Sequence, residues 1–117
     1  MKTIVLFLFL SASIGLFGQG NLQFNQVINV EYSSTGTSVT VPVGKTWKIE
    51  GCMISSINSY SCMTINGITY FMRQHNTSSS AWDNFPFWLT EGKTVNFGSN
   101  CSGASGIVSI IEFNIVP

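Results

Sequence analysis

Apolar and polar residues alternate with a period of two along nearly all of the chain after residue 20. No stretch keeps the spacing of an amphipathic helix. Successive side chains of a strand point to opposite sides of a sheet, so this period indicates strands with one buried face. The pattern predicts an all-β chain of about eight short strands. In the first of them, over residues 22–32, the apolar residues expected on one face are Leu22, Phe24, Ile28, Val30 and Tyr32.

The strongest local signal is the dipeptide Asn66-Gly67, which stands between Ile65 and Ile68. Asn and Gly tolerate a positive φ at both central positions, as a two-residue type I′ hairpin requires. We therefore expect a tight hairpin here. Its expected opposite pairs are Ile65 with Ile68, Met63 with Tyr70, and Cys62 with Phe71.

Two segments of the chain repeat one pattern, an apolar strand end followed by Gly-Lys-Thr and a new alternating run. The glycines of these segments are Gly44 and Gly92. A nucleotide-binding P-loop needs a further glycine five residues earlier and a helix afterwards. Val39 and Phe87 occupy those earlier positions, so the P-loop interpretation fails. We expect two equivalent corners of one sandwich, and eight strands with a tight hairpin and paired corners predict a jelly roll.

Four segments between residues 39 and 116 resemble a known group of proteins. They are VTVPVGKTWKIE, TINGITYF, FPFWL before the second Gly-Lys-Thr, and the closing IVSIIEFNIV. Together they resemble small secreted bacterial jelly-roll domains related in shape to the tumour-necrosis-factor-like fold. The resemblance implies a homotrimer that binds through its loops or outer faces.

The N-terminus has the organisation of a secretory signal peptide. Lys2 precedes an apolar run over residues 4–10, and a stretch rich in Ser and Gly leads to Gln19. An uncleaved anchor is the alternative, but a spanning helix needs about 20 predominantly apolar residues. We expect cleavage within residues 15–19, which leaves residues 20–117 as one domain with no membrane span. The protein is then secreted or held at the cell surface, with the periplasm as a further possibility.

Residues 20–117 carry four Lys or Arg and five Asp or Glu, with no basic cluster. The electrostatic pattern of nucleic-acid binding is therefore missing. Nothing in the chain indicates a cofactor. A domain of this size is marginal on core burial alone, so we expect help from a disulfide or an oligomeric interface.

The chain has three cysteines, Cys52, Cys62 and Cys101, so one remains after any single disulfide. Cys52 and Cys62 lie on successive expected strands, and a bridge between them is the first expectation. A Cys62–Cys101 bridge and the absence of any bridge are the alternatives. The spacing of the cysteines does not match a zinc site, and no metal is expected.

Catalytic groups are sparse. His75 is the only histidine, and it lies in a polar segment with residues 78–80 and Asp83. No nucleophile motif surrounds these residues, and the acidic residues of the strands show no sign of a facing pair. We expect a protein that is not an enzyme, and a small secreted hydrolase is the second alternative.

Aromatic residues give the one hint of a ligand. Trp82 lies outside the strand alternation, and Tyr60 and His75 are the other weak candidates for ligand binding. Exposed Trp and Tyr side chains can stack on sugar rings or anchor a protein interface. A carbohydrate-binding module that uses Trp82 is therefore the first alternative function. Phe87 and Leu89, in contrast, have the alternation of core residues.

The last expected strand, residues 107–116, is apolar on both faces. One set is Ile107, Ile111, Phe113 and Ile115, and the other is Val108, Ile110 and Val116. We assign the second set to an oligomer interface, because a two-layer sandwich buries one face of each sheet. The leading hypothesis is a secreted, non-enzymatic binding or assembly module, a homo-oligomer with three copies favoured. Its partner would be a glycan or a surface protein.

Overall fold

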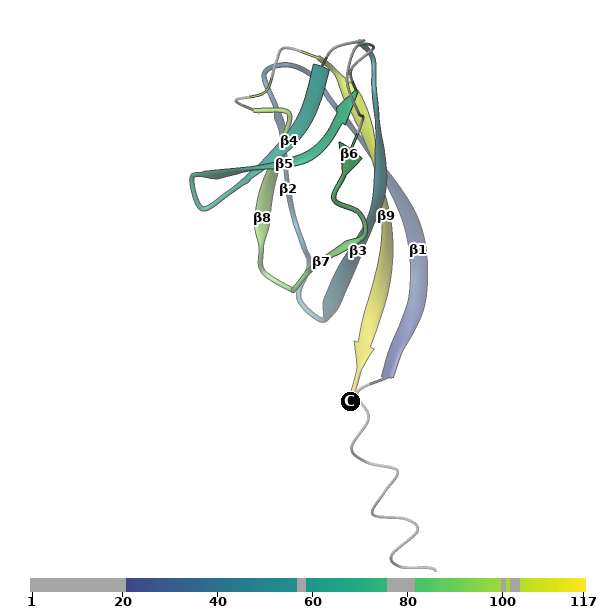
Figure 1. Ribbon diagram of the computed structural model, residues 1–117. Helices are drawn as coiled ribbons and strands as arrows, with labels where there is room; N and C mark the ends of the chain where they lie inside the picture. Colours follow the sequence, from purple (N-terminus) through teal and green to yellow (C-terminus); the bar gives the residue numbers. More distant parts are fainter. Residues whose placement is uncertain (1–20, 57–58, 76–81, 100, 102–103) are drawn as a thin grey trace, which may run out of the picture.

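The computed structural model describes residues 21–56, 59–75, 82–99, 101 and 104–117 (Figure 1). The predicted signal peptide and its cleavage zone lie outside these residues. The described part of the chain consists of strands and connecting turns. No helix in it is long and apolar enough to cross a membrane.

Two antiparallel sheets pack face to face. The four-stranded sheet has the order β1-β9-β3-β7, and the five-stranded sheet has the order β2-β8-β4-β5-β6. The strands are β1 Asn21–Tyr32, β2 Thr37–Thr40, β3 Lys45–Ile54, β4 Ser59–Ile65, β5 Ile68–His75, β6 Trp82–Asp83, β7 Phe87–Leu89, β8 Thr94–Phe97 and β9 Gly106–Val116.

The order of the strands is that of a jelly roll. The connections β1–β2, β2–β3, β3–β4, β6–β7, β7–β8 and β8–β9 all cross from one sheet to the other. Such crossing interleaves the two sheets as paired Greek keys. The expected fold class is therefore confirmed, with the two-residue strand β6 added at one edge of the second sheet.

The predicted hairpin joins β4 and β5. Asn66 and Gly67 both have a positive φ, of 51° and 76°. The three expected pairs, Ile65 with Ile68, Met63 with Tyr70 and Cys62 with Phe71, are the observed register partners. The Asn-Gly signal thus predicted both the turn and its register.

The two Gly-Lys-Thr segments form matching corners between the sheets. Gly44 and Gly92 have a positive φ of 74° and 76°, and each corner closes a four-residue turn through the amide of its lysine. The corners also contact each other, since the Gly92 amide donates to the Val41 carbonyl at 2.9 Å and the Val41 amide donates to the Lys93 carbonyl at 2.9 Å. The interpretation of these segments as equivalent corners is confirmed.

The core lies between the sheets and is built from inward-facing residues of both. Val108 and Ile110 of β9 are fully buried in it. Their assignment to an oligomer interface is therefore wrong, and Val116 is half-buried at the end of β9. A strand that is apolar on both faces does not reveal which face meets the second sheet. The core residues are Val30, Tyr32, Val41, Trp47, Ile49, Cys52, Met63, Met72, Leu89, Val95, Phe97, Val108 and Ile110.

The face predicted for the first strand is also corrected. A β-bulge shifts the register of β1 against β9 between Phe24 and Gln26. One extra residue reverses the direction of the side chains that precede it. Ile28 therefore faces inward, whereas Leu22 and Phe24 point away from the core and are exposed. In Figure 1 this end of β1 and the adjoining end of β9 extend past the second sheet.

Candidate functional site

The outward face of the four-stranded sheet carries a set of apolar side chains. Register partners in an antiparallel sheet point to the same side. Phe24 lies opposite Phe113, and Val27 lies opposite Ile111. Ile111 follows the buried Ile110 and therefore points outward. We call this set the outer apolar face, and its members are Leu22, Phe24, Val27, Met53, Trp88, Ile107, Ile111, Phe113 and Ile115.

Several members of the outer apolar face are strongly exposed to solvent. The exposed fractions are 63% for Phe24, 57% for Val27 and 65% for Met53. The ring of Trp88 lies 5.6 Å from that of Phe113. Isolated exposed apolar residues are ordinary, but a contiguous apolar patch is typical of an interaction site. The face thus has the composition of a protein interface.

Lys48 is a cation on this face, and it lies between the apolar Trp88 and the acidic Glu50. Its Nζ is 5.9 Å from the centre of the Trp88 ring and 2.6 Å from Oε1 of Glu50. The charge of Lys48 is thus compensated within the same chain. An apolar partner that covers Trp88 does not have to bury an unpaired charge.

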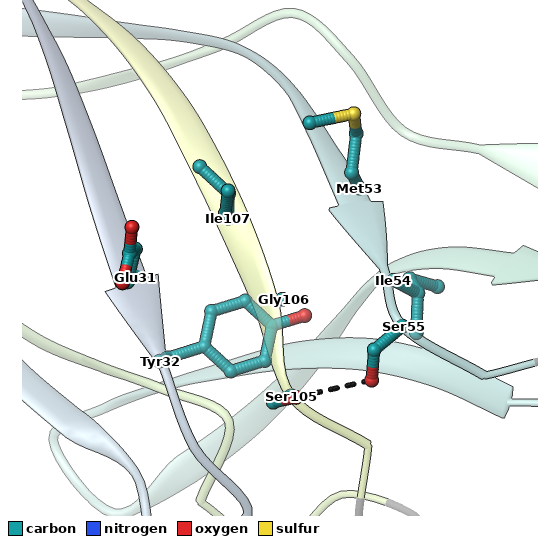
Figure 2. Close-up of a pocket in the computed structure, with 8 residues that line it drawn as sticks. All are labelled: Glu31, Tyr32, Met53, Ile54, Ser55, Ser105, Gly106 and Ile107. Atoms are coloured by element: carbon teal, nitrogen blue, oxygen red, sulfur yellow. Dashed lines mark hydrogen bonds between the residues drawn. The ribbon is translucent and has the colours of Figure 1, made fainter.

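Two hollows indent the outer face near the end of β3. Figure 2 shows the first, with a volume of about 390 Å³, between Met53 and Ile107 on one side and Ser55 and Ser105 on the other. The two serine hydroxyls are joined by a hydrogen bond of 3.0 Å. A second hollow, of about 400 Å³, includes Gly51, where no side chain fills the space. Both hollows are lined by Met53 and Ile107 of the outer apolar face.

Tyr32 also lines the first hollow. Burial raises the pKa of Tyr32 to about 12, so its phenol is neutral and does not act as a base near neutral pH. Burial likewise raises the pKa of the Cys52 thiol. A thiol with a raised pKa is a poor nucleophile. Tyr32 and Cys52 therefore act as packing residues of the core and not as reactive groups.

A second candidate surface lies on the outward face of the five-stranded sheet. Tyr60, Phe71, Gln74 and Trp82 line a pocket of about 230 Å³ there. Two of the three ligand-binding candidates, Tyr60 and Trp82, thus come together. The third, His75, ends β5, with Ser59 as its register partner, and its side chain lies outside the described part of the structure.

The predicted Cys52–Cys62 disulfide is wrong, because Cys62 is bonded to Cys101, with their Cα atoms 5.9 Å apart. Cys52 and Cys62 follow each other along the chain, but they lie in different sheets. The inward-facing residue of β4 that meets Cys52 is Ser61, whose Oγ is 2.9 Å from Cys52 Sγ. Cys62 points the other way, and its Sγ lies 3.3 Å from the carbonyl oxygen of Ser99.

Glu112 is a buried acid, with 3% of its surface exposed. Its carboxylate accepts hydrogen bonds from Asn25 at 2.6 Å, Gln26 at 3.0 Å and Trp47 at 2.7 Å. Burial by itself raises the pKa of Glu112, but these three hydrogen bonds and the charge of Lys45 outweigh it and lower the pKa below the ordinary 4.5. The group is therefore a carboxylate that ties β1, β3 and β9 together, and not a proton donor.

The candidate catalytic residues form no described constellation. Asp83 is exposed in β6, with Arg73 as its register partner. The serines at positions 78–80 lie outside the described residues. Over the described positions, no group of three or more His, Cys, Asp or Glu side chains is placed to hold a metal ion.

Comparisons of the chain with family models, curated proteins and solved structures found no match. Sequence reasoning missed Phe71 and Gln74 in the pocket, as well as the exposed Val27 and Met53. The predicted hairpin register correctly placed Phe71 opposite Cys62, but nothing in the sequence marked Phe71 as exposed.

Proposed function

We propose that the protein is a secreted, non-enzymatic jelly-roll module that assembles into a homo-oligomer through its outer apolar face. The observation that carries the proposal is the exposure of Phe24, Val27 and Met53 on one side of one sheet. Burying a side chain of this size is worth roughly 1.5–3 kcal/mol. Several such residues, repeated in each copy of a symmetric interface, supply the stability that so small a domain lacks.

A second copy of this chain is the proposed occupant because the face is mostly apolar and its cation Lys48 is already paired with Glu50. The Lys48–Glu50 contact compensates this charge within the chain, and Glu31, the register partner of Ile107, is a carboxylate on the same side of the sheet. The resemblance to tumour-necrosis-factor-like domains favours three copies around an axis. The predicted signal peptide supports the part of the proposal that places the protein outside the cell or at the cell surface.

The test is the molar mass of the mature protein in solution, measured by light scattering during gel filtration. We expect the wild type to have the mass of three chains and Val27→Lys to have the mass of one. The charge placed in the interface would have to be desolvated. Val43→Lys is the matched control, because Val43 is exposed in a corner turn and not on the outer apolar face. It should keep the wild-type mass.

Circular dichroism should show the same β-sheet signal in all three proteins. A wild type that is monomeric at micromolar concentration would contradict the assembly proposal. A mass of two chains would replace the threefold arrangement by a twofold one.

A further inference from the structure

The pocket on the five-stranded sheet is formed by a row of residues across three strands. Tyr60 of β4 lies opposite Gln74 of β5, and Gln74 lies opposite Trp82 of β6. Partners in one row point to the same side of a sheet. The opposite side of this sheet packs on the core, so the row is directed outward. It lies on the far side of the sandwich from the outer apolar face.

A register shift of β5 against β4 completes the pocket. Ser61 lies opposite Arg73 and Cys62 opposite Phe71, so Met72 is the extra residue. Met72 is buried in the core, whereas Phe71 is 49% exposed. The shift thereby brings Phe71 to the same side as Gln74, three positions away.

The aromatic rings are held in defined orientations. The rings of Tyr60 and Phe71 meet edge to face, with centres 5.1 Å apart and planes at 81°. Trp82 Nε1 donates to Gln74 Oε1 at 2.6 Å, which orients an indole that is 38% exposed. Since Gln74 uses its oxygen in this bond, its amide Nε2 is the donor that it can offer to a ligand.

The pocket lining combines three aromatic side chains with one amide, and none of the four carries a formal charge. The nearest described acid along the chain is the exposed Asp83, which follows Trp82. Further along the outward face, Thr64 pairs with Thr69 through their hydroxyls at 3.3 Å, and Asn96 Nδ2 donates to Ser38 Oγ at 2.9 Å. Aromatic rings next to amides and hydroxyls suit a ligand that has an apolar face and neutral polar edges.

We propose that this pocket, which we call the aromatic pocket, binds one neutral hexopyranose ring of a glycan. The C–H face of the sugar stacks on Trp82 and contacts Phe71, and Gln74 Nε2 donates to a ring hydroxyl. A volume of about 230 Å³ is below the roughly 300–1,000 Å³ of sites for drug-sized ligands. The pocket therefore holds a single ring, with the rest of the glycan along the hydroxyl-rich sheet surface.

The experiment is calorimetric titration of the mature protein with cellohexaose, maltohexaose, laminarihexaose and mannohexaose, all neutral hexose oligomers. At least one should bind saturably. Trp82→Ala should weaken that binding about tenfold, the loss of one aromatic contact of about 1.4 kcal/mol, and Trp82→Phe should restore part of it. Trp88→Ala is the matched control, because Trp88 is an exposed tryptophan on the other sheet. It should bind as the wild type does.

Saturation-transfer NMR on the oligosaccharide that binds most tightly should show the strongest contact at the ring protons of one hexose. The aromatic pocket and the outer apolar face lie on different sheets. Val27→Lys should therefore bind the oligosaccharide with unchanged affinity even if the protein no longer assembles. Absence of binding by all four oligomers at millimolar concentration would overturn the proposal. So would an affinity that Trp82→Ala leaves unaltered.

Discussion

Glu112 shows how a single acidic residue can hold three strands of a small domain. The bulge in β1 directs two consecutive side chains, Asn25 and Gln26, to the same carboxylate, and Trp47 approaches it from β3. A buried carboxylate without such donors would take up a proton. Here the donors keep the pKa of Glu112 below its ordinary value. The residue therefore has a structural role in the middle of an apolar strand.

The lowered pKa of Glu112 predicts a loss of stability in acid. A group whose pKa is lower in the folded than in the unfolded state stabilises the fold above its unfolded pKa. That contribution should be present above about pH 4.5 and decline as the pH falls through the folded pKa. Glu112→Gln should lower the free energy of unfolding at pH 7 by about 1.5–3 kcal/mol and flatten its acid dependence.

The measurement is denaturant unfolding followed at a series of pH values. Glu31→Gln is the control, since Glu31 is exposed in β1, and it should keep the wild-type profile. An unchanged acid profile in Glu112→Gln would show that another group is responsible.

At the scale of the elements, β-bulges decide which side chains share a face. The register shifts in β1, in β3 near Glu50 and in β5 near Met72 each add one residue to a strand. The first turns Phe24 outward, and the last brings Phe71 beside Gln74. The Phe24 end of the outer apolar face and the position of Phe71 in the aromatic pocket therefore depend on single inserted residues. A strict period of two would have placed both side chains on the opposite side.

The two corners each have a glycine in a backbone conformation that other residues rarely adopt. Gly44 and Gly92 have a positive φ, and an added Cβ would meet nothing within 4 Å at either position. The cost of alanine is then conformational and equal at the two sites. Gly44→Ala and Gly92→Ala should each lower the free energy of unfolding by about 1–2 kcal/mol.

Denaturant unfolding measures both effects. Gly51→Ala is the matched control, because Gly51 also has open space around its Cα but no positive φ. Its stability should be unchanged or raised by about 0.5–1 kcal/mol. A much larger loss at one corner than at the other would disprove their equivalence.

At the scale of the whole molecule, the sandwich sorts β9 into a core face and an outer face. Ile110 is fully buried between the sheets, and the next residue, Ile111, lies on the outer apolar face opposite Val27. The outer apolar face and the aromatic pocket are thereby placed on different sheets. An oligomer formed through the first leaves the second open to a ligand.

Two adjacent substitutions test this sorting. Ile110→Lys should abolish the β-sheet circular-dichroism signal, because a charge without a partner would enter the core, and Ile110→Ala should already lower the free energy of unfolding by about 2–5 kcal/mol. Ile111→Lys should keep the sheet signal and dissociate the oligomer. A folded Ile110→Lys protein together with an unfolded Ile111→Lys protein would show that Ile111 lies on the core face of β9 and Ile110 on the outer face.

The local features of this fold follow from short stretches of sequence. The period of two predicted an all-β domain, because strand geometry alternates the side chains. Asn66-Gly67 predicted a turn and the pairs that follow from it, since the positive φ angles of that turn admit few other residues. The two Gly-Lys-Thr segments predicted the corners for the same reason. Each of these features depends on neighbours in the chain.

Which faces and which cysteines meet depends on how the two sheets pack. Both sides of β9 are apolar, so only the packing of the second sheet shows that Val108 and Ile110 are core residues. The Cys62–Cys101 bond joins residues far apart in sequence, and the closer Cys52 meets Ser61 because strands that follow each other belong to different sheets. The aromatic pocket depends on the register shift at Met72. The alternation of apolar and polar residues along a strand indicates that the strand has two faces. Which face is buried depends on contacts with segments that are distant in the sequence.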